Sequence, residues 1–227
     1  MTKCSVCGSS EFTENAVLWD ALIHEWQLSI AEVNYINKQQ GKYCNSCGTN
    51  LRSIALADAL LAHCKSTLLL KDWVKSSSAA ELRILEINEA GMLTPQIKSL
   101  SKHILATYPA VDIHNLPYEN GSFDVVLHSD TLEHVANPVH ALSECRRVLK
   151  PGGALCFTVP IIVGRMSRSR EGLPKSYHGQ ASTDTDDFSV RTEFGADAWI
   201  YVMEAGFSAL TMHAVEFPAA IAIRAVA

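Results

Sequence analysis

Residues 112–135 read DIHNLPYENGSFDVVLHSDTLEHV, and this stretch decides the fold class. Its centre, residues 123–128, is an apolar run typical of a strand that is covered on both faces. Asn137-Pro138 then predicts the start of a helix, with the Asn as its cap and the Pro at its first position. Pro151-Gly152-Gly153 is expected to end that helix, and residues 154–159 read as the next strand.

The same alternation extends outward in both directions. Upstream, the pattern predicts strands at residues 82–87 and 103–107 with a helix between them at 93–101. Downstream, it predicts a helix with Trp199, Ile200 and Met203 facing inward, followed by a closing antiparallel pair of strands at 209–216 and 219–225. Such alternation favours an α/β layered sheet with helices on its faces.

The composition limits the classes of protein. The chain has 227 residues, which at roughly 150 residues per domain allows one domain and a smaller unit. Lys and Arg number 19 against 24 Asp and Glu, a net charge of −5, which argues against a general nucleic-acid binder. We find no stretch with the pattern of a signal peptide or membrane span, so we expect a cytoplasmic protein with no membrane partner.

Four of the seven cysteines form two copies of one short motif near the N-terminus. Cys4 and Cys7 precede Gly8, and Cys44 and Cys47 precede Gly48. A two-residue gap lets both thiolates reach one ion, so two such pairs predict a tetrahedral structural zinc site. Residues 1–50 are therefore expected to form a zinc-ribbon-like segment, with a helix at residues 18–36 between the pairs. A redox role for one pair, or four core thiols, remain as alternatives.

Three blocks of sequence carry a family resemblance. They are Ile84-Leu85-Glu86-Ile87, the stretch 112–135, and Arg147-Val148-Leu149-Lys150-Pro151-Gly152-Gly153. In this order and spacing they resemble the class I S-adenosylmethionine-dependent methyltransferases. The four-cysteine segment also resembles one carried by a subset of that family. The resemblance implies a Rossmann-like methyltransferase domain over residues 51–227.

The resemblance also implies which residues contact the cofactor S-adenosylmethionine. Glu86 occupies the position of the family's acid at the methionine end, Asp112 that of the acid that binds the adenine amino group, and Ser129 lies beside the methyl group. The remaining expected contacts come from the loop after the first strand and from the adenine side: Asn88, Ala90, Gly91, Tyr108 and Ile113.

This chain departs from the family pattern in two places. The three glycines of the family's loop are replaced here by Asn88, Ala90 and Met92. Thr107-Tyr108-Pro109 stands where the family has an acid for the ribose, and few residues separate it from Asp112. A parallel crossover needs a dozen or more residues. We therefore expect one edge of the sheet to be reduced, with the family's third strand short or absent.

The sequence gives fewer indications of the residues that would bind the methyl acceptor. His134 and His128 are candidates for a catalytic base, since an imidazole titrates near neutrality; for His134 a hydrogen-bonding role at a helix start is the alternative. The basic stretch after the strand 154–159 predicts an anionic acceptor, bound by Arg165, Arg168, Arg170, Tyr177 and His178. A solvated loop is the alternative for that stretch.

These observations favour a methyltransferase that acts on a small molecule, an anionic one if the basic stretch binds it. Two other classes of function stay open. One is a non-catalytic member that binds a partner, because the glycine loop is degenerate. The other is a methyltransferase that acts on RNA or protein through the zinc segment, although the net negative charge argues against RNA.

Overall fold

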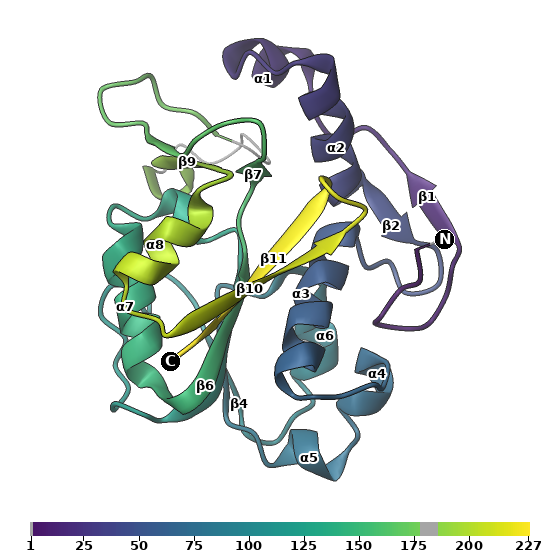
Figure 1. Ribbon diagram of the computed structural model, residues 1–227, viewed down its shortest axis with the longest axis vertical. Coiled ribbons are helices and arrows are strands. Elements are labelled where there is room, and N and C mark those ends of the chain that lie inside the picture. The colour runs from purple at the N-terminus through teal and green to yellow at the C-terminus, as the bar shows by residue number, and fades with distance from the viewer. Residues whose placement is uncertain (1, 178–185) are drawn as a thin grey trace.

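The computed structural model describes residues 2–177 and 186–227 and is built around one six-stranded mixed sheet (Figure 1). Its strand order is β10-β11-β6-β5-β3-β4. The four parallel strands are β3 (Ile84–Ile87), β4 (His103–Ala106), β5 (Phe123–Ser129) and β6 (Leu149–Thr158). The last two strands, β10 (Ala209–Val215) and β11 (Ala220–Val226), form the expected antiparallel pair.

The reduced sheet edge is confirmed. Strand β4 lies at the edge, and the chain passes from it to β5 through residues 107–122 without a helix or a further strand. Strand β3 lies between the two, paired in parallel with both. The family's second crossover helix is therefore absent between β4 and β5, as the sequence predicts.

Helices cover both faces of the sheet (Figure 1). On one face lies α3 (Leu51–His63), with the short helices α4 (Leu70–Trp73), α5 (Ser77–Ala80), η1 (Gly91–Leu93) and α6 (Thr94–Ile97) following it in the chain. On the other face lie α7 (Pro138–Val148) and α8 (Ala198–Glu204). Neighbouring strand residues alternate between the two cores: Val125 and Leu127 pack toward α3, whereas Val126 packs toward α7. This alternation explains why β5 is apolar throughout.

The remaining elements gather near the carboxyl ends of the strands. The N-terminal part contains β1 (Phe12–Glu14), α1 (Asp20–Glu25), α2 (Ile30–Gly41) and β2 (Lys42–Cys44). After β6 come β7 (Ile161–Ile162), β8 (Arg168–Ser169), η3 (Asp186–Phe188) and β9 (Thr192–Gly195). The short helix η2 (Leu132–His134) follows β5. Within the described residues, no helix is long and apolar enough to cross a membrane.

Several local predictions need correction. The single helix expected at 18–36 is two helices, because the chain turns at Gln27 with φ 49° and restarts at the Ser29–Glu32 capping box. The helix expected at 93–101 is only the short pair η1 and α6. The segment Pro151-Gly152-Gly153 lies inside β6, where the pairing with β5 is irregular, rather than in a turn before it.

The buried face of α8 is also not the expected one. Ala198 and Val202 are buried, whereas Trp199 and Met203 are 43% and 44% exposed. The face of α8 that packs against the domain carries the smaller side chains Ala198 and Val202, whereas the larger Trp199 and Met203 face outward. Contact with α7, rather than the size of the apolar side chains, therefore decides which face of α8 is buried.

Candidate functional site

The four N-terminal cysteines form one compact cluster. Their sulfur atoms all lie within 4.8 Å of one another, with Cys4 Sγ 3.7 Å from Cys47 Sγ and Cys7 Sγ 3.4 Å from Cys44 Sγ. Four thiolates at about 2.3 Å from one zinc ion lie about 3.8 Å apart, so the donor set and its spacing fit zinc.

Both cysteine pairs adopt the same turn. The amide of Gly8 donates to the Cys4 carbonyl at 2.8 Å, and the amide of Gly48 donates to the Cys44 carbonyl at 2.8 Å. Both glycines have positive φ, 90° and 75°, which other residues adopt at a cost. Burial opposes ionisation of Cys44, but hydrogen bonds from the amides of Cys47 and Ser46 outweigh it and lower its pKa to about 7.

The acid of the first strand is fully buried and fully engaged. Glu86 accepts a hydrogen bond from the Ala90 amide at 2.6 Å and one from the Thr94 hydroxyl, and its second oxygen lies 2.6 Å from His103 Nε2. Burial raises the pKa of Glu86, but these partners, His103 first, outweigh burial and hold it below the usual value. Glu86 therefore fixes the shape of the loop that follows it.

The loop after β3 makes a tight turn although the glycines typical of the family are missing from it. Asn88 and Glu89 adopt positive φ, 54° and 58°. The Asn88 side-chain oxygen accepts from the Tyr108 amide at 2.8 Å, which ties the loop to the end of β4. At Gly91, with φ 57°, a Cβ would lie 2.9 Å from Ser53 Oγ, so this position has no room for a side chain unless Ser53 moves.

Ser129, at the end of β5, joins the same edge of the sheet. Its hydroxyl lies 2.8 Å from Thr158 Oγ1, and a Cβ on Gly91 would lie 3.5 Å from Ser129 Oγ. The structure thus brings Glu86, Gly91 and Ser129 together at the carboxyl ends of adjacent parallel strands, where open α/β sheets bind ligands.

The expected adenine side lies on the loop after β4. Asp112 is half exposed and accepts from the His114 amide at 2.9 Å, which lowers its pKa. The charge of Asp187, whose carboxylate accepts from the Tyr108 hydroxyl at 3.3 Å, raises the pKa of Tyr108, and the charge of Asp112 adds to this effect. The side chain of Ile113 is buried.

The two candidate histidines have different surroundings. His128 is completely buried and stacks on Phe157 at 5.0 Å between ring centres; burial lowers its pKa to about 4. This position offers no access to an acceptor, so the prediction of His128 as a base is not retained. His134 lies at a cavity wall, with Nδ1 3.2 Å from the Ser189 carbonyl and Nε2 3.7 Å from Glu133.

The basic stretch after β6 is held by carboxylates of the chain itself. Arg165 pairs with Glu32 at 2.6 Å, and Arg168 and Arg170 both pair with the buried Glu193. The bond from Arg165 lowers the pKa of Glu32 to about 2. The argument for an anionic acceptor therefore needs correction, because the charges that were to bind it are compensated.

The two other residues predicted for the acceptor give no further support to an anionic ligand. Tyr177 is half-buried at the end of the described stretch. His178 lies outside the described residues.

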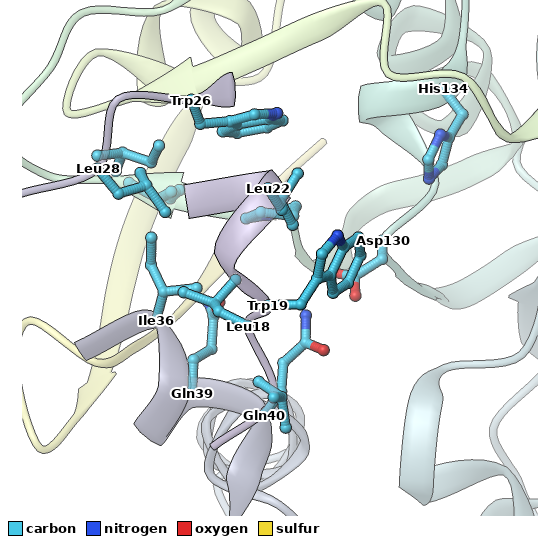
Figure 2. Close-up of a pocket in the computed structure, with 14 residues that line it drawn as sticks. Leu18, Trp19, Leu22, Trp26, Leu28, Ile36, Gln39, Gln40, Asp130 and His134 are labelled. Atoms are coloured by element: carbon cyan, nitrogen blue, oxygen red, sulfur yellow. The ribbon is translucent and has the colours of Figure 1, made fainter. Parts of the chain in front are cut away.

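A cavity of about 290 Å³ opens beside His134 (Figure 2). Helices α1 and α2, with the turns before and after α1, form one side of it, and the segments that follow β5 and β6, including residues of η2 and β7, form the other. Its walls are mostly apolar; the members are Val17, Leu18, Trp19, Leu22, Trp26, Leu28, Ile36, Gln39, Gln40, Asp130, His134, Pro160, Ile161 and Ile162.

Sequence reasoning missed the contribution of α3 to this site. Arg52 forms an ion pair with Asp130, the residue after Ser129. Ser53 Oγ accepts from the Met92 amide at 3.1 Å. The sequence gives one signal for this role, since Arg52 and Ser53 come shortly after the second cysteine pair. The first turn of α3 therefore lies between the cysteine cluster and the loop that follows β3.

Part of the chain is similar in sequence to known methyltransferases. A family model described as a methyltransferase domain matches residues 64–157. A probable S-adenosylmethionine-dependent methyltransferase of Mycolicibacterium smegmatis is 40% identical over 63 residues, which are 26% of this chain and 24% of that protein. A ubiquinone biosynthesis O-methyltransferase of Roseobacter denitrificans is 40% identical over 81 residues, 32% of each chain.

A crystal structure of a methyltransferase from Thermotoga maritima is 17% identical, with a TM-score of 0.47, and the match covers 78% of this chain and 89% of that one. In the curated relatives, the matched stretch spans less than half of their own length. The matched residues include three of the four parallel strands of the sheet and most of the fourth. Residues 64–157 thus match a methyltransferase domain within a Rossmann-like α/β sheet, and a four-cysteine cluster lies near the N-terminus.

Proposed function

We propose that this chain binds S-adenosylmethionine at the carboxyl ends of β3, β4 and β5 and transfers its methyl group to a small molecule. The observation that carries the proposal is the convergence of Glu86, Gly91 and Ser129 at this edge, within the matched residues 64–157.

In this proposal the chain positions two reactants. S-adenosylmethionine, held by the residues at this edge of the sheet, would supply an activated methyl group to the acceptor. Asp112 accepts a hydrogen bond from the adenine amino group, and Glu86 holds the loop against the methionine end. Orientation of this kind lowers the barrier because the reacting atoms are already in place.

His134 is the group that we propose takes the proton released by the acceptor. Its Nδ1 lies 3.2 Å from the Ser189 carbonyl, which can only accept, so Nδ1 carries a proton. In the neutral ring, Nε2 is then the atom that can take a proton.

We further propose that residues 1–50 form a zinc-binding segment and residues 51–227 the methyltransferase domain. Cys4, Cys7, Cys44 and Cys47 would hold one structural zinc ion. Four thiolates leave no open coordination position, which is typical of structural rather than catalytic zinc.

The test is calorimetric titration of the full chain with S-adenosylhomocysteine. Asp112→Ala should weaken binding by about 1.5–3 kcal/mol, the range for a hydrogen bond to a charged group. Glu119→Ala removes another exposed carboxylate from the same loop and should leave the affinity unchanged. If the unaltered chain does not bind the ligand, the alternative of a non-catalytic partner-binding module replaces this proposal.

A further inference from the structure

The cavity beside His134 is mostly apolar, with four polar residues among the described residues that line it. Of the fourteen described residues that line it, ten are apolar, and Trp19, Leu22 and Trp26 of the α1 region form much of one side (Figure 2). Asp130 and His134 come from the segment that follows β5, directly after Ser129. Gln39 and Gln40 of α2 supply the other polar side chains, so the segment after β5 contributes the two lining residues with a carboxylate or an imidazole.

The wall formed by α1 is held rigidly. Trp26 is only 8% exposed, and its ring nitrogen donates to Ser176 Oγ at 2.7 Å. The Arg170 guanidinium lies 5.9 Å from the centre of the indole ring. Arg165 donates to the Trp26 carbonyl at 2.8 Å while it pairs with Glu32. The arginines of the basic stretch therefore support the cavity wall rather than receive a ligand.

The charges around the cavity disfavour an anion. No Lys or Arg occurs among the described residues that line it, and Asp130 brings a carboxylate that is paired with Arg52. An anion would lose its hydration on entry without gaining a cation in exchange. A hydroxyl or amino group can instead hydrogen-bond to side chains such as Asp130 and His134, while the tryptophans and aliphatic side chains cover an apolar ring.

We propose that the methyl acceptor is an apolar, ring-bearing small molecule with one hydroxyl or amino group, which enters this cavity with that group toward Asp130 and His134. The inference rests on the proposed methyltransferase function and names the class of acceptor for it. A volume of about 290 Å³ admits one or two fused rings.

Two probes that share a ring system but differ in charge test the proposal. The zinc-loaded full chain, with and without saturating S-adenosylhomocysteine, is titrated calorimetrically with 2-naphthol and with 2-naphthoate. We expect 2-naphthol to bind at least tenfold more tightly than 2-naphthoate. Trp19→Ala, at a side chain already 42% exposed, should weaken 2-naphthol binding roughly fivefold or more through loss of an aromatic contact.

A matched control is Ile30→Ser, which removes an 82% exposed apolar side chain of α2 that does not line the cavity. It should leave the affinity for 2-naphthol unchanged, and both variants should bind S-adenosylhomocysteine like the unaltered chain. Equal or tighter binding of 2-naphthoate, or indifference to Trp19→Ala, would overturn the inference. So would failure of 2-naphthol to bind while S-adenosylhomocysteine still does, and that result leaves the proposed function intact. Loss of S-adenosylhomocysteine binding alone would instead overturn the proposed function, and with it the assignment of the cavity to an acceptor.

Discussion

Glu86 illustrates how one side chain is used in two ways. The resemblance assigns it to the methionine end of the cofactor, but in the structure its oxygens already receive hydrogen bonds from Ala90, Thr94 and His103. A buried carboxylate needs such partners, because an unpaired one would be costly. Any contact with the cofactor is therefore made by a carboxylate that at the same time shapes the loop.

His128 is the residue whose burial has a measurable consequence. Its pKa is about 4 in the folded chain and 6.5 in its ordinary state, because burial outweighs the opposing effect of Glu133. The unfolded chain takes up this proton near pH 6.5, whereas the folded chain does so only near pH 4. Lowering the pH through this window therefore favours the unfolded chain.

We predict that His128→Phe removes this pH dependence. Between pH 7.5 and pH 4.5, the free energy of unfolding of the unaltered chain should fall by between about 2 and 3 kcal/mol more than that of the variant. Denaturant titrations at both pH values measure the difference. His128→Leu packs differently but also cannot titrate, so it should give the same result; parallel pH curves for all three chains would contradict the prediction.

At the scale of elements, the first turn of α3 compensates for the missing loop glycines. The loop is held by Ser53 from one side, and on the other side its own Asn88 accepts from the Tyr108 amide beyond the end of β4. Backbone amides with fixed partners keep a loop in one conformation even where glycine is absent. A degenerate glycine motif therefore does not by itself indicate that the cofactor loop has lost its shape.

We predict that Ser53→Ala weakens binding of S-adenosylhomocysteine about fivefold. The substitution leaves the Met92 amide without its acceptor, a loss of about 1 kcal/mol that falls on the cofactor loop. Ser66→Ala removes a similar hydroxyl, one that accepts from the Leu68 amide beyond the other end of α3, and serves as the control. Equal affinities for the two variants would show that α3 does not position the loop.

At the scale of the whole molecule, the N-terminal segment and the sheet share one core. Cys4, Val6 and Cys44 belong to the same apolar cluster as Ile54 of α3 and Leu127 of β5. Backbone bonds from Leu70 and Lys71 to Ser5 and Val6, and the ion pair of Lys42 with Glu216 at 2.6 Å, add to this contact. We therefore expect disruption of the cysteine cluster to destabilise the packing of α3 as well.

We predict one equivalent of zinc per chain by elemental analysis of untagged protein. Cys44→Ser should lose the metal, unfold the N-terminal segment and lower the melting temperature by roughly 10 °C, while most of the secondary structure of the α/β domain stays. Cys64→Ser changes a half-buried cysteine outside the cluster and should keep full zinc content. A folded, metal-free chain with four titratable thiols would contradict the zinc assignment.

The sequence by itself determined the features that depend on local pattern and spacing. The apolar run of β5, the Asn137-Pro138 helix start and the closing strand pair were all predicted and are present. The reduced sheet edge was predicted because only a few residues separate Thr107-Tyr108-Pro109 from Asp112, fewer than the dozen or more that a parallel crossover needs. The repeated cysteine motif likewise predicted that its four thiols come together, because two identical turns can direct their thiolates to one ion.

Tertiary structure alone decided which distant segments meet. Arg165 pairs with Glu32 across 133 positions of the chain, so a stretch that looks like an anion site is a set of internal ion pairs. The cavity is formed by α1 and α2 against the ends of β5 and β6, and no local pattern indicates that contact. The physical reason is that the partner of a charge, or the wall of a cavity, is set by the packing of remote elements, whereas the period of a strand or the cap of a helix is set by its immediate neighbours.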